Sequence, residues 1–460
     1  AMGKKKKKEM ENQRQKFLSG ASEKNIPPSI AESIFSKMEK FAGYGFNKSH
    51  SVAYAYISYQ TAYLKTYHTS EFLASALSSD MDNTDKVISL ISAAKEMNID
   101  IIKPDINSST YEFTAINANK ILFGLGAIKG IGFNAVKHLV EERERGGKYN
   151  NIFDLCERVS HNIINIGAMD SLIYSGACDS FEKSRAFIKK ILDKALMYGQ
   201  KRQITKTHGQ SELFAGETST TVEYEVSSIE SDVKETREIK LKTLNQEKKV
   251  LGLYLSGHPI NEFKEEIKSM GLNTINFYFN KLNDGIKEDY SEQISLTGVI
   301  VASRMQRVGS DRFINILSLD DSTGSIEVII YPDIFDKYKS MLKENEILFV
   351  SGTISIDEYN GSLSLKAVSV VDLDYARQNY SKQIELLITS DKTNDIVIGK
   401  LMRILEPHKN GKCPLVIKCV SNKHIVPLSL DNEWHVNATS ALVKDLTSLL
   451  GSENITIKYK

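Results

Sequence analysis

The sequence predicts a multidomain protein of the α+β class. Apolar residues recur at helical spacing through the first hundred positions, a glycine-rich turn then separates two segments of the same kind, and five short alternating strands follow near position 300. With 460 residues the chain is long enough for three or four domains. Its 41% hydrophobic and 25% charged residues are typical of a globular protein and exclude a disordered or fibrous one.

Neither membrane insertion nor secretion is predicted. The sequence has no apolar run close to the ~18 residues of a membrane span and no secretory signal, so we expect a cytoplasmic protein without a membrane partner. Its cysteines fit neither a disulfide framework nor a CxxC metal pattern, and we expect reduced, structural thiols and no metal site. The cysteines are Cys156, Cys178, Cys413 and Cys419.

Charge is distributed unevenly, although the formal net charge is only +1. Residues 1–50 hold eleven Lys and Arg against five Asp and Glu, whereas residues 212–238 hold two against eight. The first stretch, with its Lys4–Lys8 run, suits a polyanion, and the second repels one. A lysine run is also typical of a solvated surface or a nuclear-import signal.

Four helices are predicted in the first hundred residues, at 29–41, 51–68, 70–79 and 84–97. In the second, five residues recur at spacings of four, three, four and four, which places them on one face that we expect to belong to the core. These residues are Val52, Tyr56, Tyr59, Tyr63 and Tyr67.

The loop before that helix, FAGYGFNKSH at 41–50, ends with a cation, a hydroxyl and an imidazole. A helix start exposes unpaired N–H groups and the positive end of the macrodipole, so Lys48, Ser49 and His50 would complete a binding site for a phosphate. The alternative is local: Ser49 or Ser51 caps the helix and His50 is a surface residue.

A glycine-rich turn lies at Lys129-Gly130-Ile131-Gly132. We predict a helix up to Ile128, a hairpin over these four residues and a second helix over 133–145, since small glycines let backbone N–H groups at a helix start approach a DNA phosphate. Residues 165–181 resemble a second, degenerate copy. Two alternatives stay open: a structural helical hairpin, and a dinucleotide site, for which the third glycine falls one position late.

Apolar periodicity fails between about 200 and 245, where Thr, Ser, Gln and Glu predominate, and a linker is predicted there. Within it, Leu213 and Phe214 are adjacent apolar residues with no amphipathic context. They either dock on a partner or fill a local groove.

Five strands are predicted at 294–302, 313–319, 325–331, 346–356 and 362–371, with a helical segment at 333–342. This order is that of an OB-fold, whose first connecting loop and last hairpin hold single-stranded nucleic acid. Here the loop at 303–312 supplies cations for phosphates and the last hairpin supplies a ring for bases, although many OB-folds bind only protein. The residues are Arg304, Arg307 and Arg312 in the loop and Tyr359 in the hairpin.

The last eighty residues alternate apolar strands at 384–388, 414–420 and 454–459 with helices near 393–405 and 439–450. We predict a small α/β module without a catalytic constellation, and we assign Trp434 to packing.

The order of these parts and several segments closely resemble the alpha subunits of bacterial DNA polymerase III. The segments are KFAGYGFNKSHSVAYAYISYQTAYLK, SSDMDNTDKV, GLGAIKGIG, FDLCERV and LGLYLSGHP. The resemblance covers essentially the whole chain, is most specific in the first 130 residues and weakens after about 375.

The resemblance implies five regions: the end of the polymerase fingers (1–105), a tandem helix-hairpin-helix region (106–200), a linker with a clamp-binding segment (201–290), an OB-fold (291–375) and a domain that binds the tau subunit of the clamp loader (376–460). It also implies that the family's PHP domain, thumb and palm, with the catalytic aspartates and their magnesium, lie outside this stretch. We therefore expect no catalytic residue and no bound cofactor here.

Three acidic residues in the fingers context, Asp80, Asp82 and Asp85, do not substitute for the palm aspartates. A helix cap of the D-x-x-D kind explains them.

The resemblance also assigns partners to particular residues. Lys48 and His50 would neutralise or orient phosphates of the incoming nucleotide. In the linker, Gln210, Leu213 and Phe214 match the family's motif for the beta sliding clamp. Duplex DNA is assigned to the helix-hairpin-helix turn and single-stranded DNA to the OB-fold.

Three functions compete at this point: the DNA-, clamp- and loader-binding part of a template-directed DNA polymerase, inactive without its palm; a non-enzymatic nucleic-acid scaffold of recombination or repair; and a dinucleotide-dependent oxidoreductase. The loop at 41–50 favours the first over the second, because a scaffold needs no fingers element. The helix-breaking Gly130 and Gly132 argue against the third.

Overall fold

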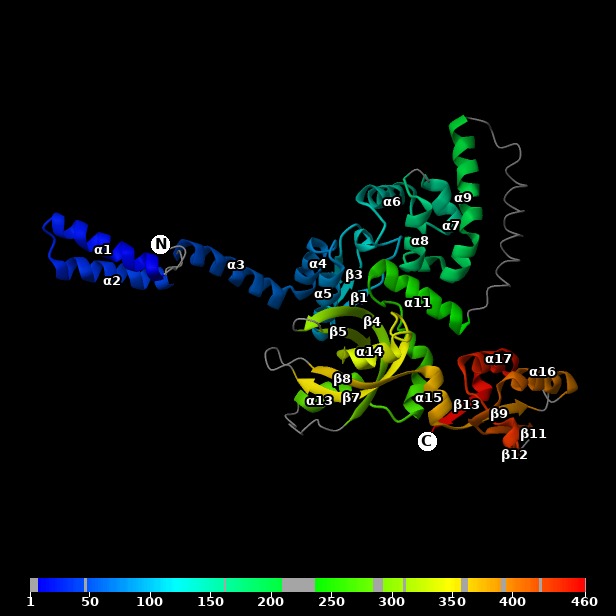
Figure 1. Ribbon diagram of the computed structural model, residues 1–460. Helices are drawn as coiled ribbons and strands as arrows, with labels where there is room; N and C mark the ends of the chain where they lie inside the picture. The colour runs from blue at the N-terminus through cyan, green and yellow to red at the C-terminus, as the bar shows by residue number, and fades with distance from the viewer. Residues whose placement is uncertain are drawn as a thin grey trace. The chain divides into compact units, whose positions relative to one another are not determined.

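The computed structural model describes most of the chain (Figure 1). The chain separates into two units. Unit one comprises Ala1–Ala127 and Ile131–Val140, and unit two comprises Ile128–Gly130 and Glu141–Lys460. The described residues are 7–44, 48–160, 163–208, 236–283, 293–308, 312–356, 363–389, 394–421 and 424–459. Among them, no helix combines the length and apolar character that crossing a membrane requires.

The described part of unit one begins with five α-helices. They are α1 (Lys7–Glu23), α2 (Pro28–Tyr44), α3 (Lys48–Tyr67), α4 (Thr69–Ser79) and α5 (Thr84–Glu96). The four predicted helices are confirmed, and α1 is an addition to them. α1 packs on α2 through the rings of Phe17 and Phe35, whose centroids are 5.5 Å apart, and through an ion pair between Arg14 and Glu32.

The aromatic face of α3 is exposed, and the prediction that it belongs to the core is wrong. α3 has no buried residue, and the exposed fractions along the stripe run from 47% at Tyr63 to 70% at Tyr59. The helical period shows which side chains share a face, but burial also requires an element packed against that face. None of the described residues covers it.

The start of α5 is capped by Asn83 rather than by the predicted D-x-x-D pair. Asn83 Oδ1 accepts a hydrogen bond from the Lys86 N–H at 3.2 Å, the contact expected of a residue directly before the first turn. Asp80 lies 2.9 Å from Lys86 Nζ and forms an ion pair with it.

A three-stranded sheet follows in unit one, in the order β1 (Asp100–Ile102), β3 (Lys120–Leu122), β2 (Thr114–Asn117). A single 3-10 turn at Leu125–Ala127 then leads towards α6 (Phe133–Gly146). The predicted helix up to Ile128 is therefore wrong, because the consecutive buried run 121–123 belongs to a strand and its continuation. The second predicted helix, over 133–145, is confirmed.

Among the described residues of unit two, six α-helices lie between α6 and the barrel. They are α7 (Ile152–Arg158), α8 (Ile166–Tyr174), α9 (Arg185–His208), α11 (Arg237–Leu251), α12 (Lys264–Ser269) and α13 (Ile275–Asn283). α9 and α11 occupy both ends of the predicted linker at 200–245, since Lys, Gln and Glu favour helix even without an apolar stripe. Residues 209–235, between them, lie outside the described residues.

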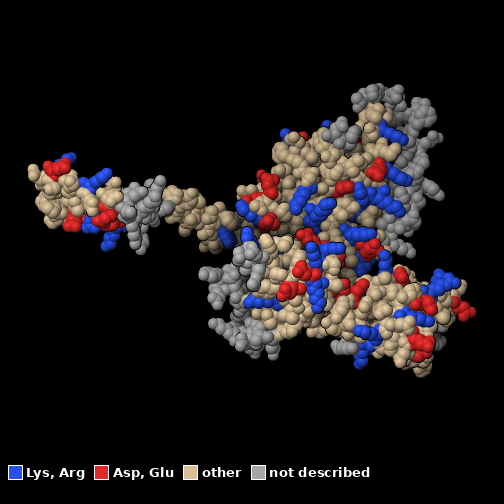
Figure 2. All heavy atoms as spheres, viewed as in Figure 1, with Lys and Arg blue, Asp and Glu red and all other residues tan. Residues whose placement is uncertain are grey.

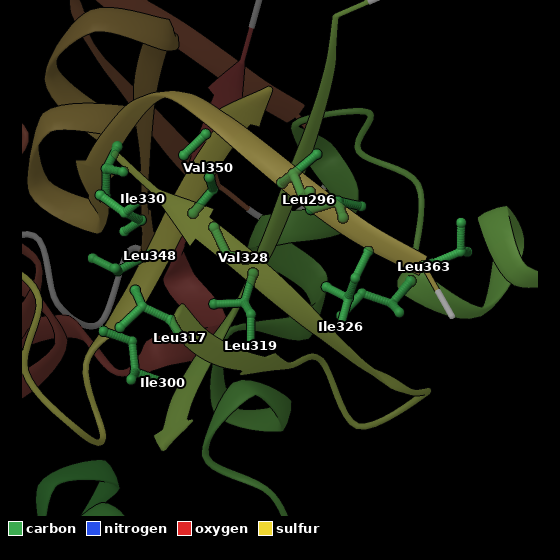
Figure 3. Packing of buried hydrophobic residues seen from close by; sticks show 14 of the residues in the cluster. Leu296, Ile300, Leu317, Leu319, Ile326, Val328, Ile330, Leu348, Val350 and Leu363 are labelled. Carbon is green, nitrogen blue, oxygen red and sulfur yellow. The ribbon is translucent and has the colours of Figure 1, made fainter. Parts of the chain in front are cut away.

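A closed five-stranded barrel follows and confirms the predicted OB-type order, with α14 (Pro332–Tyr338) after the third strand. The strands, β4 (Ile294–Val308), β5 (Arg312–Asp320), β6 (Ser325–Ile330), β7 (Ile347–Ile356) and β8 (Leu363–Asp372), pair in the order β4-β5-β6-β8-β7. Alternate apolar residues point inward and are fully buried, among them Leu317, Leu319 and Val328 (Figure 3).

α11 and the loop after it are bound to the barrel by a small polar network. Lys248 Nζ donates to the carbonyl of Val301 at 2.6 Å, and the Tyr254 hydroxyl donates to Asn345 Oδ1 at 2.9 Å. Burial lowers the pKa of Lys248 and raises that of Tyr254. Because these groups are partly withdrawn from water, the contact holds the barrel in a defined position against α11.

In the last module, α16 (Asp395–Leu405) and α17 (Ser440–Leu450) pack with a four-stranded sheet. Its other elements are α15 (Leu373–Tyr380), β9 (Ser381–Thr389), β10 (Lys409–Cys413), β11 (Leu415–Ser421), β12 (His424–Ser429) and β13 (Ile455–Tyr459). The sheet order is β12-β11-β9-β13, so the three predicted strands and both helices are confirmed. Trp434 packs on this core, with Lys409 Nζ 3.5 Å from its ring centroid.

A buried ion pair joins this module to α12. The Arg377 guanidinium is 1% exposed and donates to both carboxylate oxygens of Glu266, at 2.6 and 2.7 Å. The Tyr459 hydroxyl donates to the same carboxylate at 2.5 Å. Burial raises the pKa of Glu266, but the bond and charge of Arg377 outweigh it and hold that pKa below its ordinary value.

Candidate nucleic-acid interface

The hairpin before α6 has the open, glycine-dependent backbone that the sequence predicts. Lys129, Gly130 and Gly132 are all exposed. Gly130 has φ +87°, a conformation that a side chain strains, while a Cβ on Gly132 would meet nothing within 4 Å. The Lys129 N–H donates to the carbonyl of Val250 at 2.9 Å, which fixes the start of the turn.

The two preceding glycines serve packing. A Cβ on Gly124 would lie 2.6 Å from backbone atoms of Glu112 and Tyr111, and one on Gly126 would lie 2.5 Å from the Tyr111 ring. Their spacing follows from these close contacts. Because packing explains both glycines, they no longer indicate a dinucleotide-binding site.

The second, degenerate hairpin is closed by a buried arginine. Gly176 has φ +86° and follows α8, as a hairpin glycine should, but a Cβ there would lie 2.3 Å from the guanidinium of Arg185. That guanidinium donates to Asp179, Glu247 and Ser256. With its turn filled by protein, this copy offers no approach to a phosphate and is structural.

The first turn of α3 presents the three side chains predicted for phosphate. Lys48 is the first residue of the helix, and Lys48, Ser49 and His50 are exposed. The His50 ring lies 4.3 Å from that of Tyr54, and the turn contains no acidic residue. Gly45–Asn47 of the predicted loop lie outside the described residues.

The arginines of the OB-type barrel lie on strands, which corrects the predicted loop at 303–312. β4 extends to Val308 and β5 begins at Arg312, so Arg304 and Arg307 belong to β4. The Arg304 guanidinium is 2.5 Å from Glu327, with both side chains more than half exposed. The side chain of Arg312 and the whole of Tyr359 lie outside the described residues, as do the predicted clamp residues Gln210, Leu213 and Phe214.

Two exposed residues beside these arginines were not predicted as site residues: Met305, 64% exposed, and Phe313, 50% exposed. Phe313 stands directly opposite Arg307 in the strand register. The sequence signal was the RMQRVGSDRF segment, where each arginine is directly followed by an apolar residue.

Charge on the face in view is mixed. Figure 2 shows Lys and Arg interspersed with Asp and Glu over unit two rather than gathered into one single-sign surface. Among the described residues no group of three or more His, Cys, Asp or Glu side chains could hold a metal ion. Cationic contacts with nucleic acid would therefore be made locally, at individual modules.

Family models and whole-chain relatives identify the same modules in the same order. A helix-hairpin-helix motif model matches residues 98–188, and a model for an OB-fold nucleic acid binding domain matches 294–373. The C-terminal domain of DNA polymerase III subunit alpha matches 400–451. DNA polymerase III subunit alpha of Escherichia coli strain K12 is 35% identical over 461 residues, covering 100% of this chain.

The chain belongs to the DNA polymerase III alpha subunit family. The alpha subunit of Vibrio cholerae is 34% identical over 459 residues and that of Buchnera aphidicola subsp. Schizaphis graminum 36% over 459, each covering 100% of this chain. The chain spans 39% of the length of these relatives and corresponds to their C-terminal portion. A solved structure, the S. pombe Stn1–Ten1 complex, matches 18% of the chain with 24% identity and a TM-score of 0.15, too low to bear on the fold.

Proposed function

We propose that this chain is the DNA- and partner-binding part of a template-directed DNA polymerase of the cytoplasm. The observation that carries the proposal is similarity to the alpha subunit over all 461 aligned residues, including the first hundred that precede both nucleic-acid-binding modules. A repair scaffold would share the modules but not that segment. The two-metal chemistry of synthesis would come from the family's palm.

The test of this division is primer extension. With template-primer, nucleotides and magnesium, the chain alone is expected to add no nucleotide, while it binds the template-primer in a mobility assay. Extension by the purified chain would contradict the assignment of catalysis to the palm.

Duplex DNA is assigned to the hairpin at Lys129–Gly132. Gly132→Val adds bulk where a Cβ meets nothing within 4 Å, so it should block close approach of a phosphate without disturbing the fold. Gly399→Val is the matched control, since Gly399 also has open space around it. Duplex affinity should fall several-fold for the first variant and stay unchanged for the second; equal affinities would make the hairpin structural.

Single-stranded DNA is assigned to the barrel, with Arg304, Arg307, Arg312 and Tyr359 as contacts. Each lost phosphate contact should lower the slope of log affinity against log salt by about 0.7. Arg304→Ala and Arg307→Ala should therefore each lower the slope, and Arg304→Ala also removes the ion pair with Glu327. A slope unchanged in both variants, in titrations with oligo-dT, would place the contact elsewhere.

The beta sliding clamp is assigned to Gln210, Leu213 and Phe214. Two buried apolar anchors would each contribute roughly 1.5–3 kcal/mol, and the Gln carboxamide would fix the register. Modest affinity suits a tethered polymerase, because DNA supplies a second attachment and linked contacts multiply. The triple alanine variant should lose clamp binding and keep DNA binding; unchanged clamp affinity in a surface-binding assay would exclude the motif.

Two further assignments take their partners from the family. Lys48, Ser49 and His50 would contact phosphates of the incoming nucleotide, and the module at 376–460 would bind the tau subunit of the clamp loader. Pull-down of tau by the chain and by a variant ending at residue 375 tests the second; equal recovery would exclude it.

A further inference from the structure

The first hairpin of the barrel extends beyond the barrel itself. β4 pairs with β7 only over Ile294–Val299, and β5 pairs with β6 only from Asn315 onward. Residues 306–308 and 312–314 therefore pair with each other alone, as a two-stranded ribbon. Each side chain on this ribbon has one neighbouring strand instead of two, which leaves room for a ligand.

One face of this ribbon continues the inner face of the barrel. Residues directly opposite each other in an antiparallel pair share a face, so Leu317 and Ser303, Asn315 and Met305, and Phe313 and Arg307 all lie on the same side. Leu317 is fully buried in the core. The face therefore runs from the apolar core outwards along the ribbon.

The core ends at a polar pair. Ser303 Oγ donates to Asn315 Oδ1 at 3.3 Å, and Asn315 is 7% exposed. Beyond this pair the apolar side chains of Met305 and Phe313 are 64% and 50% exposed. They contribute little to the barrel core, so their exposure, Met305 at the base of the ribbon and Phe313 on it, calls for a different explanation.

We propose that Phe313 and Met305 form a stacking site for the bases of single-stranded DNA, with Arg307 holding the adjoining phosphate. The inference rests on the proposed binding of single strands by the barrel and names the residues that would contact the bases. A ring opposite a guanidinium offers a base an aromatic face and its phosphate a cation within one cross-strand spacing. Residues 303–313 hold three Arg and one Asp, which favours a polyanion over a basic or neutral partner.

The test separates contacts with bases from contacts with phosphates, because an abasic strand lacks the bases but keeps the phosphates. Affinity is measured by fluorescence anisotropy for oligo-dT of about 16 nucleotides, the upper end for one OB-fold, and for an abasic strand with the same phosphates. Phe313→Ala and Phe313→Leu should weaken oligo-dT roughly 5- to 150-fold and leave the abasic strand unchanged. Met305→Ala should act in the same direction with a smaller effect, and Arg307→Ala should weaken both strands.

A matched control and an added reporter sharpen the result. Tyr375→Ala removes a ring that is 48% exposed on α15 of the same unit and should change neither affinity. Because the chain has one tryptophan, Trp434, the additional fluorescence of Phe313→Trp reports on the ribbon and should be quenched by oligo-dT more than by the abasic strand.

The outcomes separate the stacking site from the proposed function. If the parent binds oligo-dT but Phe313→Ala changes neither strand, or weakens both equally, the stacking site is refuted and binding through cations survives. A loss of the same size in Tyr375→Ala also refutes it. If the parent binds neither strand, the assignment of single-stranded DNA to the barrel fails as well.

Discussion

The barrel strands and α3 both carry apolar residues at regular spacing, but these residues are buried in the barrel and exposed on α3. In the barrel, alternate residues such as Leu317 and Val328 are fully buried, because strands closed on themselves cover every inward side chain. In α3, a face of tyrosines at regular helical spacing stays 47–70% exposed. A periodic pattern thus predicts which residues lie together, whereas burial depends on whether another element packs against them.

The same contrast holds for ion pairs. Glu266 binds an arginine that is 1% exposed, while Glu327 binds Arg304 at a surface where both side chains are more than half exposed. Breaking the buried pair should therefore lower the free energy of unfolding strongly, whereas breaking the exposed pair should change it little.

The largest expected effect is therefore at Glu266. Glu266→Ala leaves the buried Arg377 without its carboxylate and should destabilise by about 3–5 kcal/mol. Urea unfolding followed through Trp434, which lies in the C-terminal module, measures it. Glu327→Ala, the exposed control, should change stability by less than about 0.5 kcal/mol; equal effects would show that burial does not separate the two pairs.

The second largest loss of stability is expected from a cavity in the barrel core. Leu317→Ala removes fully buried methyl groups and should cost about 2–5 kcal/mol, since the closed barrel cannot collapse freely around the space. Faster hydrogen exchange of the β5 amides, with α3 amides unchanged, is the expected readout. Protection of β5 equal to that of the parent would mean that the barrel is loosely packed.

Acid should weaken the contact of α12 with the C-terminal module. The folded-state pKa of Glu266 lies below its ordinary 4.5, so its contribution is complete above that pH and is lost as the pH falls through the folded pKa. The stability difference between the parent and Glu266→Gln should therefore shrink from pH 7 towards pH 3. A difference independent of pH would exclude the ionised pair.

The smallest effect should be in α3. Tyr59, 70% exposed, contacts too little protein for its loss to matter, and Tyr59→Ala should change the stability of unit one by less than about 0.5 kcal/mol. Thermal unfolding by circular dichroism measures it. A cost near that of Leu317→Ala would show that the face is covered in solution.

The sequence by itself determined the order of modules, because helical and strand periods and glycine turns are local properties. It predicted the α3 helix, the second helix of the hairpin pair, the five barrel strands with their intervening helix and the C-terminal α/β alternation. Glycine at 130 could be assigned to a turn from its neighbours alone, since glycine adopts the positive φ found there without the strain that a Cβ adds.

Tertiary structure decided what those local patterns could not reveal. The run 121–123 begins in strand β3 rather than in a helix because β1 and β2 pair along both edges of β3. Gly124 and Gly126 reflect contacts with residues at 111 and 112 that spacing does not encode. The second hairpin was closed by Arg185, whose partners lie up to 71 residues away. Phe313 and Arg307 became a pair only through strand register, because a cross-strand neighbour depends on pairing rather than on sequence distance.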